Sequence, residues 1–76
     1  MNGFESAHEF ASRRGYRVGY AARRPDGRLV VGGHKGEYGA SDCHYMVAVS
    51  RGKSFRVIVE NVLWDDYEAA LKNEAP

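Results

Sequence analysis

Several features that define large classes of proteins are missing from this sequence of 76 residues. It has a single cysteine, Cys43, so no disulfide bond can form within the chain. Small domains in oxidising compartments usually carry several disulfide bonds, so their lack predicts a cytoplasmic location. The first 14 residues carry two acids and no apolar run, unlike a signal peptide. No apolar segment approaches the roughly 20 residues that span a bilayer, so we expect no membrane partner.

The motifs of metal centres and of common enzyme classes are missing as well. The sequence contains no C-x-x-C or H-x-x-x-H pair, no Gly-x-Gly-x-x-Gly run, no P-loop and no nucleophile elbow. Cys43 and His44 are adjacent and would point to opposite faces of a strand, a poor arrangement for one tetrahedral zinc ion. A cysteine nucleophile would need a neighbouring base such as His34 or His8, and only the residue types are present. We expect no enzyme, and therefore no catalytic residue, no metal and no cofactor.

What the sequence does contain is charge of both signs in separate regions. Between Phe10 and Arg56 there are ten basic and three acidic residues, whereas both ends of the chain are acidic overall. Hydrophobic residues make up 43% and charged residues 28%, which is typical of one ordinary globular domain spanning residues 1–76. The separation of charge predicts a polarised surface.

Hydrophobic spacing predicts a helix at each end of the chain. The first ends before Gly15, a common helix stop, and the second covers about residues 63–73, with Asp65 and Asp66 in its first turn. Each helix has one apolar stripe at helical spacing. The stripes consist of Phe4, Ala7, Phe10 and Ala11 in the first helix and Leu63, Tyr67, Ala70 and Leu71 in the second.

Alternating apolar residues between the helices predict two hairpins. Pro25-Asp26-Gly27 is a strong turn signal, and the resulting register pairs Tyr20 with Gly32, where the large ring would cover the glycine. The same register pairs Ala22 with Val30 and Val18 with His34.

The second hairpin joins residues 44–49 to residues 55–62, and two registers compete. Pairing Ser50 with Ser54 makes one face of the hairpin wholly apolar and sets His44 opposite Glu60, whereas a two-residue Arg51-Gly52 turn would mix the faces. We favour the first register because a slip of one residue would expose the apolar face. That face would consist of Tyr45, Val47, Val49, Phe55, Val57 and Val59.

The expected fold is therefore α+β, in the order α-β-β-β-β-α. A four-stranded antiparallel β-meander flanked by an N-terminal and a C-terminal helix, both on one face of the sheet, is the simplest way to bury both stripes. Residues 32–43 hold four of the nine glycines and are predicted to form a flexible loop between the hairpins. Candidate binding residues in this loop are His34, Lys35, Glu37 and Tyr38.

Two charged surfaces are candidate partner-binding sites. In a meander both hairpin tips lie at one end of the sheet, which would gather six cations into a basic rim consisting of Arg23, Arg24, Arg28, Arg51, Lys53 and Arg56. The start of the second helix forms an acidic-aromatic cluster consisting of Trp64, Asp65, Asp66 and Glu68. Aromatic residues ringed by charge often anchor protein interfaces. The alternatives are that the rim cations are only solvated and that Trp64 and Tyr67 simply cap the core, which we favour for Tyr67.

These features favour a small non-enzymatic protein-binding module, a monomer or a homodimer, whose partner is a larger protein or a ribonucleoprotein complex. In size and style the chain is similar to small phage-encoded inhibitors of host nucleic-acid machines, including anti-CRISPR proteins. That resemblance implies an inhibitor encoded by a phage or mobile element and acting in the host-cell cytoplasm, and it assigns no residue. The alternative hypothesis is direct nucleic-acid binding through the basic rim, which has ample cations for phosphate contacts.

Overall fold

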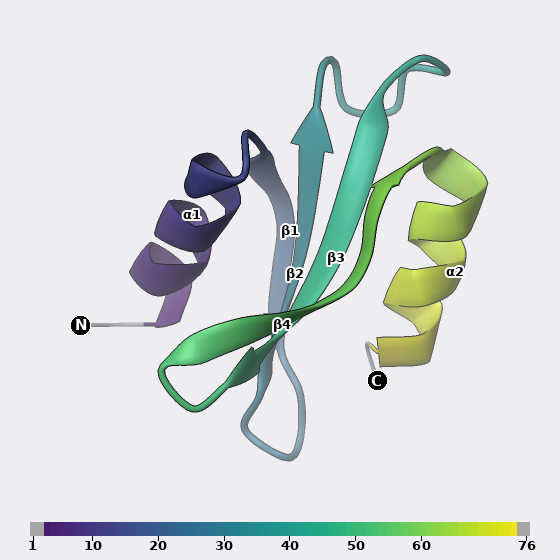
Figure 1. The fold of residues 1–76 in the computed structure, drawn as a ribbon. Helices are drawn as coiled ribbons and strands as arrows, with labels where there is room; N and C mark the ends of the chain where they lie inside the picture. Colours follow the sequence, from purple (N-terminus) through teal and green to yellow (C-terminus); the bar gives the residue numbers. More distant parts are fainter. Residues whose placement is uncertain (1–2, 75–76) are drawn as a thin grey trace.

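The computed structural model describes the backbone of residues 3–74 and the side chains of residues 6–74, so the side chain of Phe4 lies outside the described residues. The order α-β-β-β-β-α and the α+β class are confirmed (Figure 1). The elements are α1 (Gly3–Arg13), β1 (Arg17–Arg23), β2 (Leu29–Lys35), β3 (His44–Arg51), β4 (Ser54–Val62) and α2 (Trp64–Glu74).

The four strands form one antiparallel sheet in the order β1-β2-β3-β4, which is the predicted meander. Both hairpin turns lie at one end of the sheet, and the loop between β2 and β3 lies at the other end (Figure 1). Helix α2 begins near that loop and ends near the hairpin turns. One end of α2 therefore lies by the candidate loop residues and the other by the predicted basic rim.

The register of the first hairpin follows the sequence prediction in two pairs and departs from it in a third. Ala22 pairs with Val30 and Tyr20 with Gly32, as expected. Val18 pairs with Gly33 instead of His34, because a β-bulge falls between Val18 and Tyr20. The turn closes with a hydrogen bond from the Gly27 N–H to the Arg24 carbonyl, 2.9 Å long.

Both registers considered for the second hairpin are wrong. Arg51 pairs with Ser54 across a two-residue turn of Gly52 and Lys53, so Ser50 does not pair with Ser54. At the far end of the strand Tyr45 aligns with Val62, so His44 is not opposite Glu60 either. Gly52 has a φ of 60°, and a two-residue hairpin turn of type II′ requires a positive φ at this first position. The conformation required by the turn therefore decided the register next to it. Two irregularities further along the β3–β4 ladder each shift the pairing again.

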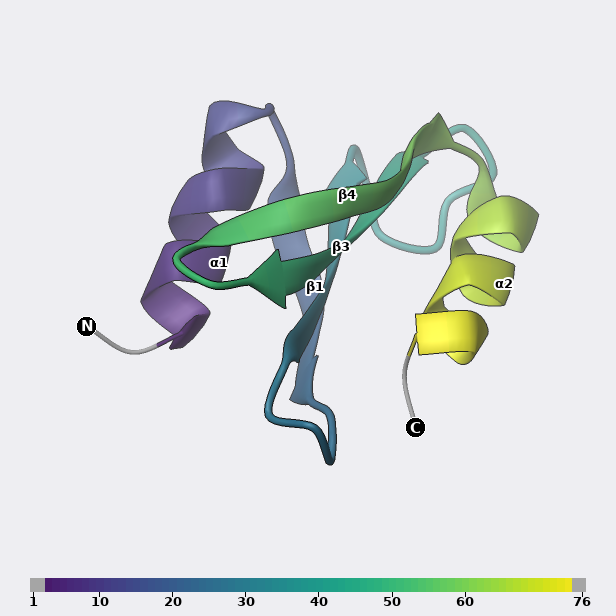
Figure 2. The same ribbon diagram turned by 60° about the horizontal axis from the view of Figure 1, so that its bottom comes forward.

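The two helices cover opposite faces of the sheet, so the prediction that both lie on one face is wrong (Figures 1 and 2). The buried residues around α1 include Val31, Met46 and Ala48, whereas Val30 and Val47 pack with α2. Successive residues of a strand point to opposite faces, and β2 and β3 each contain consecutive apolar residues. One helical layer would leave half of these side chains in water, so each face requires a helix of its own.

Strand β2 also continues further than expected, so residues 32–35 are not part of a loop. Gly32 and Gly33 are buried in the sheet, and the loop proper begins at Gly36. The ring that covers Gly32 is that of Tyr67 from α2, because a Cβ atom added at Gly32 would collide with the Tyr67 hydroxyl. Glycine is needed here to let α2 approach the sheet closely, which corrects the expected role of Tyr20.

Candidate functional site

The basic rim exists as a structural unit, because both hairpin tips contribute to the same hollows. Arg23 and Gly27 of the first tip line one hollow with Gly52 and Lys53 of the second. Arg28 of the first tip lines another hollow with residues of the second hairpin. The structure therefore brings together the residues that the sequence places at one end of the meander.

Five of the six rim cations have no carboxylate partner among residues 6–74. Arg24 is the exception, because its guanidinium contacts Asp26 at 3.0 Å and Glu74 at 3.3 Å. These contacts attach the last turn of α2 to the first hairpin, so Arg24 has a structural role. Arg23 donates a hydrogen bond of 2.7 Å to the Gly27 carbonyl, which leaves its charge uncompensated. The cations without an ion pair in this part of the chain are Arg23, Arg28, Arg51, Lys53 and Arg56.

The sheet divides the rim into two surfaces of different character. On the side of α1, two adjoining hollows of about 560 and 200 Å³ share Ser6, Lys53, Ser54 and Phe55, and together we name them the α1-side groove. On the side of α2, a hollow of about 290 Å³ is lined by three arginines, and we name it the α2-side pocket. Its lining residues are Arg28, Val49, Ser50, Arg51, Arg56, Ile58 and Glu74.

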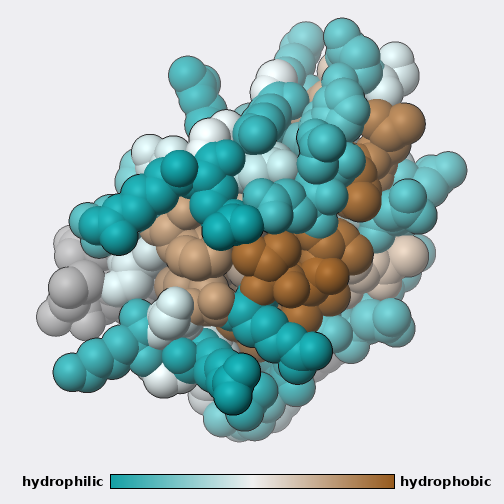
Figure 3. Space-filling model, viewed as in Figure 1, coloured by the Kyte–Doolittle hydropathy of each residue, from teal (hydrophilic) through white to brown (hydrophobic). Residues whose placement is uncertain are grey.

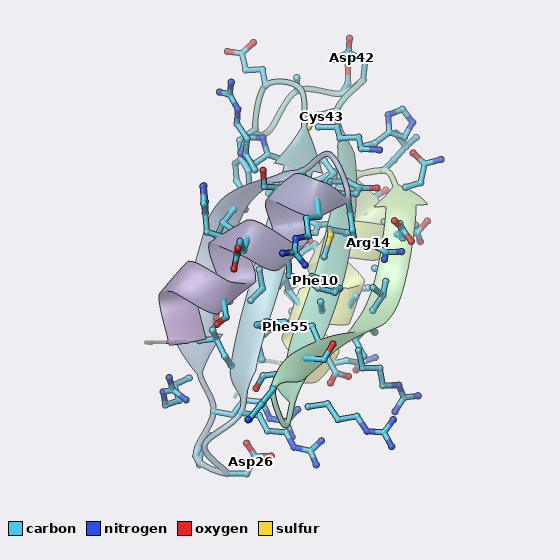
Figure 4. All side chains as sticks on the ribbon, turned by 60° about the vertical axis from the view of Figure 1, so that its left-hand side comes forward. Phe10, Arg14, Asp26, Asp42, Cys43 and Phe55 are labelled. Atoms are coloured by element: carbon cyan, nitrogen blue, oxygen red, sulfur yellow. The ribbon has the colours of Figure 1, made fainter. Side chains whose placement is uncertain are left out.

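The α1-side groove combines an aromatic floor with a cationic border. The rings of Phe10 and Phe55 pack with centroids 5.1 Å apart, and Figure 4 shows them facing each other between α1 and β4. Arg13, Arg23 and Lys53 line the groove, and only Arg13 has an acidic partner, Glu9 at 3.6 Å. Figure 3 shows apolar surface beside α1 that continues into the middle of the view, with hydrophilic surface above and below it.

An ion pair that sequence spacing did not reveal attaches Arg14, the residue that follows α1, to β4. Arg14, which is labelled in Figure 4, donates two hydrogen bonds to the Glu60 carboxylate, 2.8 and 3.2 Å long. These hydrogen bonds lower the pKa of Glu60 and raise that of Arg14. Close by, the Asn61 N–H donates to the Tyr16 hydroxyl at 3.0 Å, so the edge of β4 is partly occupied.

The acidic-aromatic cluster lies at the opposite end of the molecule from the basic rim. Asp65 and Asp66 are exposed at the start of α2, and Glu68 pairs with Lys72 at 3.8 Å. Trp64 is half-buried against other aromatic rings, and Tyr67 is fully buried, which confirms its place in the core.

Four aromatic side chains from three separate segments form one cluster at this end. The Tyr38 ring packs edge-on against Tyr45, Trp64 and Tyr67, with centroids 5.7 to 6.1 Å apart. Tyr38 and Tyr67 share a hydrogen bond of 3.0 Å between their hydroxyls, and burial raises the pKa of Tyr67. The Gly39 N–H donates to the Tyr45 hydroxyl at 2.7 Å. Sequence reasoning missed this cluster because its members are dispersed over residues 38–67.

Three of the four candidate loop residues contact neighbouring groups of the protein. His34 donates through Nδ1 to the Gly36 carbonyl at 2.8 Å and packs edge-on against Tyr38. Lys35 places its ammonium 4.5 Å from the centre of the Tyr16 ring, and Glu37 is exposed. Tyr38 remains 41% exposed despite these ring contacts.

The remaining candidates for chemistry are the metal-ligand side chains and the single cysteine. Within residues 6–74 no group of three or more His, Cys, Asp and Glu side chains could hold a metal ion. Cys43 is buried, and its thiol donates to the Lys35 carbonyl at 3.1 Å. No helix in the described part of the chain has the length and apolar character needed to cross a membrane.

Comparison with protein-family models, curated proteins and solved structures found no match to this chain.

Proposed function

We propose that this chain is a non-enzymatic binding protein that docks its α1-side groove onto an acidic, partly apolar face of a larger protein or ribonucleoprotein complex. The observation that carries the proposal is the pairing of the Phe10–Phe55 floor with Arg23 and Lys53, two cations that have no carboxylate partner in residues 6–74. Aromatic and arginine side chains dominate the energetics of protein interfaces. Uncompensated cations at the border also steer an acidic partner toward the groove.

Inhibition of a host nucleic-acid machine by occlusion is the activity that we propose for this binding. The chain exposes 4887 Å² of surface, and a standard interface of about 800 Å² per partner would use roughly a sixth of it. A partner face covered in this way is closed to its natural ligand, so no catalytic group is required. An origin in a phage or other mobile element is part of the same proposal.

The alternative, direct nucleic-acid binding through the whole rim, is less well supported by the geometry. The rim cations are divided by the sheet, so Arg23 and Lys53 line a different hollow from the three arginines on the α2 side. Arg24 is already engaged by Asp26 and Glu74. A continuous track of six phosphate contacts is therefore not what this surface offers.

The test is a pull-down with tagged protein from a bacterial lysate, with and without nuclease. The groove variant is Arg23→Glu with Lys53→Glu, and the control is Arg28→Glu with Arg56→Glu, which makes the same charge change on the other face. We expect a defined protein partner that survives nuclease, that the groove variant captures at least about tenfold less, and that the control retains.

Three outcomes would contradict the proposal. Equal capture by wild type and groove variant would remove the groove from the interface. Loss of the partner only in Trp64→Ala with Asp66→Lys would move the interface to the acidic-aromatic cluster. Recovery of nucleic acid alone, lost after nuclease treatment, would favour the alternative function. Circular dichroism of every variant checks that folding is preserved.

A further inference from the structure

The α2-side pocket brings together three arginines from three segments of the chain. Val30, Val49 and Arg56 form one row across β2, β3 and β4. Arg28 lies two residues from Val30, and Arg51 lies two residues from Val49. Side chains two apart in a strand share a face, so Arg51 extends from the same face as Val49 and Arg56, and Arg28, which directly precedes β2, lines the same hollow. They line a single hollow of about 290 Å³.

The positive charge of this pocket is not compensated within residues 6–74. Neither Arg28, Arg51 nor Arg56 takes part in an ion pair there. The one acidic residue in the lining, Glu74, is already engaged by Arg24 at 3.3 Å. Cations held close together repel one another, and a bound anion would relieve that repulsion.

The lining favours phosphate groups over other ligands. Planar guanidinium groups bind phosphate oxygens in a bidentate manner. The pocket volume of about 290 Å³ lies at the lower end of the roughly 300 to 1,000 Å³ of small-molecule sites, so it can take charged groups of a larger ligand. Arg28 directly precedes β2 and Arg56 lies in β4, so their backbones stand about 10 Å apart at roughly 4.8 Å per strand. Three arginines attached over this width can reach more than one anionic group, which suits neighbouring phosphates of a backbone.

We propose that the α2-side pocket binds the phosphate backbone of a nucleic acid, without reading its sequence. The residues that line the pocket include no aromatic side chain on which a base could stack, and stacking and base-edge contacts are what read sequence. This inference goes beyond the proposed function and does not depend on it, because the two sites lie on opposite faces of the sheet. Together they would let one rim contact the protein and the nucleic acid of a ribonucleoprotein.

The experiment measures binding of a fluorescein-labelled ten-nucleotide oligo(dT) by fluorescence anisotropy between 25 and 200 mM salt. The test variant is Arg28→Gln, Arg51→Gln and Arg56→Gln. The matched control, Arg13→Gln, Arg23→Gln and Lys53→Gln, removes the same number of charges from the α1-side groove. Wild type should show a logarithmic salt slope of about −2, from three phosphate contacts at about 0.7 each. We expect the test variant to bind at least tenfold more weakly with a slope near zero, and the control to change by less than about threefold.

Equal losses in both triple variants would overturn the inference, because general charge attraction would then explain binding. Absence of saturable binding at 25 mM salt would also overturn it. A parallel titration with labelled poly-glutamate identifies the ligand class, and tighter binding of that polymer, lost in the test variant, would assign the pocket to acidic protein. Because the pull-down uses changes on the other face, either proposal can fail while the other stands.

Discussion

The choice of residue at individual positions of this protein is limited by the side chains that pack against them from other elements. Gly32 lies in the interior of β2, where a side chain of its own would normally strengthen the strand. The Tyr67 ring of α2 occupies that space, and its hydroxyl bonds Tyr38 from the loop. One missing side chain therefore lets a helix, a strand and a loop meet at one point.

Gly32→Ala should lower the free energy of unfolding by about 1–3 kcal/mol, because the added methyl group collides with the Tyr67 hydroxyl. Urea denaturation followed by circular dichroism measures the loss. Tyr67→Phe in the Gly32→Ala background removes the closest colliding atom and should recover part of it. The two substitutions should therefore be non-additive by at least about 0.5 kcal/mol, and simple additivity would show that the ring does not cover Gly32.

At the scale of elements, the β3–β4 hairpin is governed by its two-residue turn. Gly52 has a φ of 60°, a backbone conformation that other residues adopt at a cost. This requirement sets the pairing of Arg51 with Ser54 and the register of the ladder as far as the pair Ala48–Val57, where the first irregularity begins.

Gly52→Ala is expected to destabilise the protein by about 1–2 kcal/mol, since alanine must adopt the left-handed region at this position. Lys53→Ala is the matched control, because Lys53 is exposed and does not have a positive φ. Thermal denaturation of the two variants side by side should lower the melting temperature only in the first. A similar decrease in both would mean that the turn does not depend on glycine.

The contact between α1 and β4 should make stability depend on pH. The Arg14 hydrogen bonds lower the pKa of Glu60 below its ordinary value of 4.5 in the folded state. Stability from this carboxylate is therefore present above the unfolded-state pKa and is lost as pH falls through the folded-state pKa. The melting temperatures of wild type and Glu60→Gln should differ at pH 6 and converge as the pH approaches 3. Arg14→Gln should give the same profile as Glu60→Gln, and a constant difference across this range would contradict the argument.

At the scale of the whole molecule, the protein is a three-layer arrangement in which the sheet lies between two helices (Figure 2). It is polarised along its length, with the basic rim at one end and the acidic-aromatic cluster at the other. The layers also separate the rim into a groove with an aromatic floor and a pocket of arginines. One end of the molecule therefore carries two surfaces that differ in composition, one partly aromatic and one lined by arginines.

The three-layer arrangement predicts at which buried positions a charged side chain would destabilise the fold. Ala48 lies on the α1 face of β3 and is fully buried. Ala48→Asp would bury an unpaired carboxylate and should cost more than about 3 kcal/mol, enough to abolish the cooperative unfolding transition. Ala69→Asp, on the exposed side of α2, is the control and should change stability by less than about 0.5 kcal/mol. A folded Ala48→Asp variant would indicate that this face of the sheet is open to solvent.

Some features of the basic rim, a candidate site, could be predicted from the sequence, and others could not. Its six members could be named because turn signals place hairpin tips, and a meander gathers those tips at one end. The neutralisation of Arg24 could not be predicted, because Glu74 is distant in sequence and reaches Arg24 only through the packing of α2. The separation of Lys53 from Arg51 by the sheet also depends on a register that the apolar pattern did not decide.

By itself the sequence determined the type and order of all six elements and the first hairpin turn, because helical spacing, strand alternation and turn chemistry act over a few neighbouring residues. Only the tertiary structure decided which face each helix covers, how β4 is registered and which aromatic rings meet around Tyr38. The consecutive apolar residues from Tyr45 to Val49 did carry a signal that β3 is buried on both faces. Which helix would cover each face depends on long-range packing, and no local pattern encodes it.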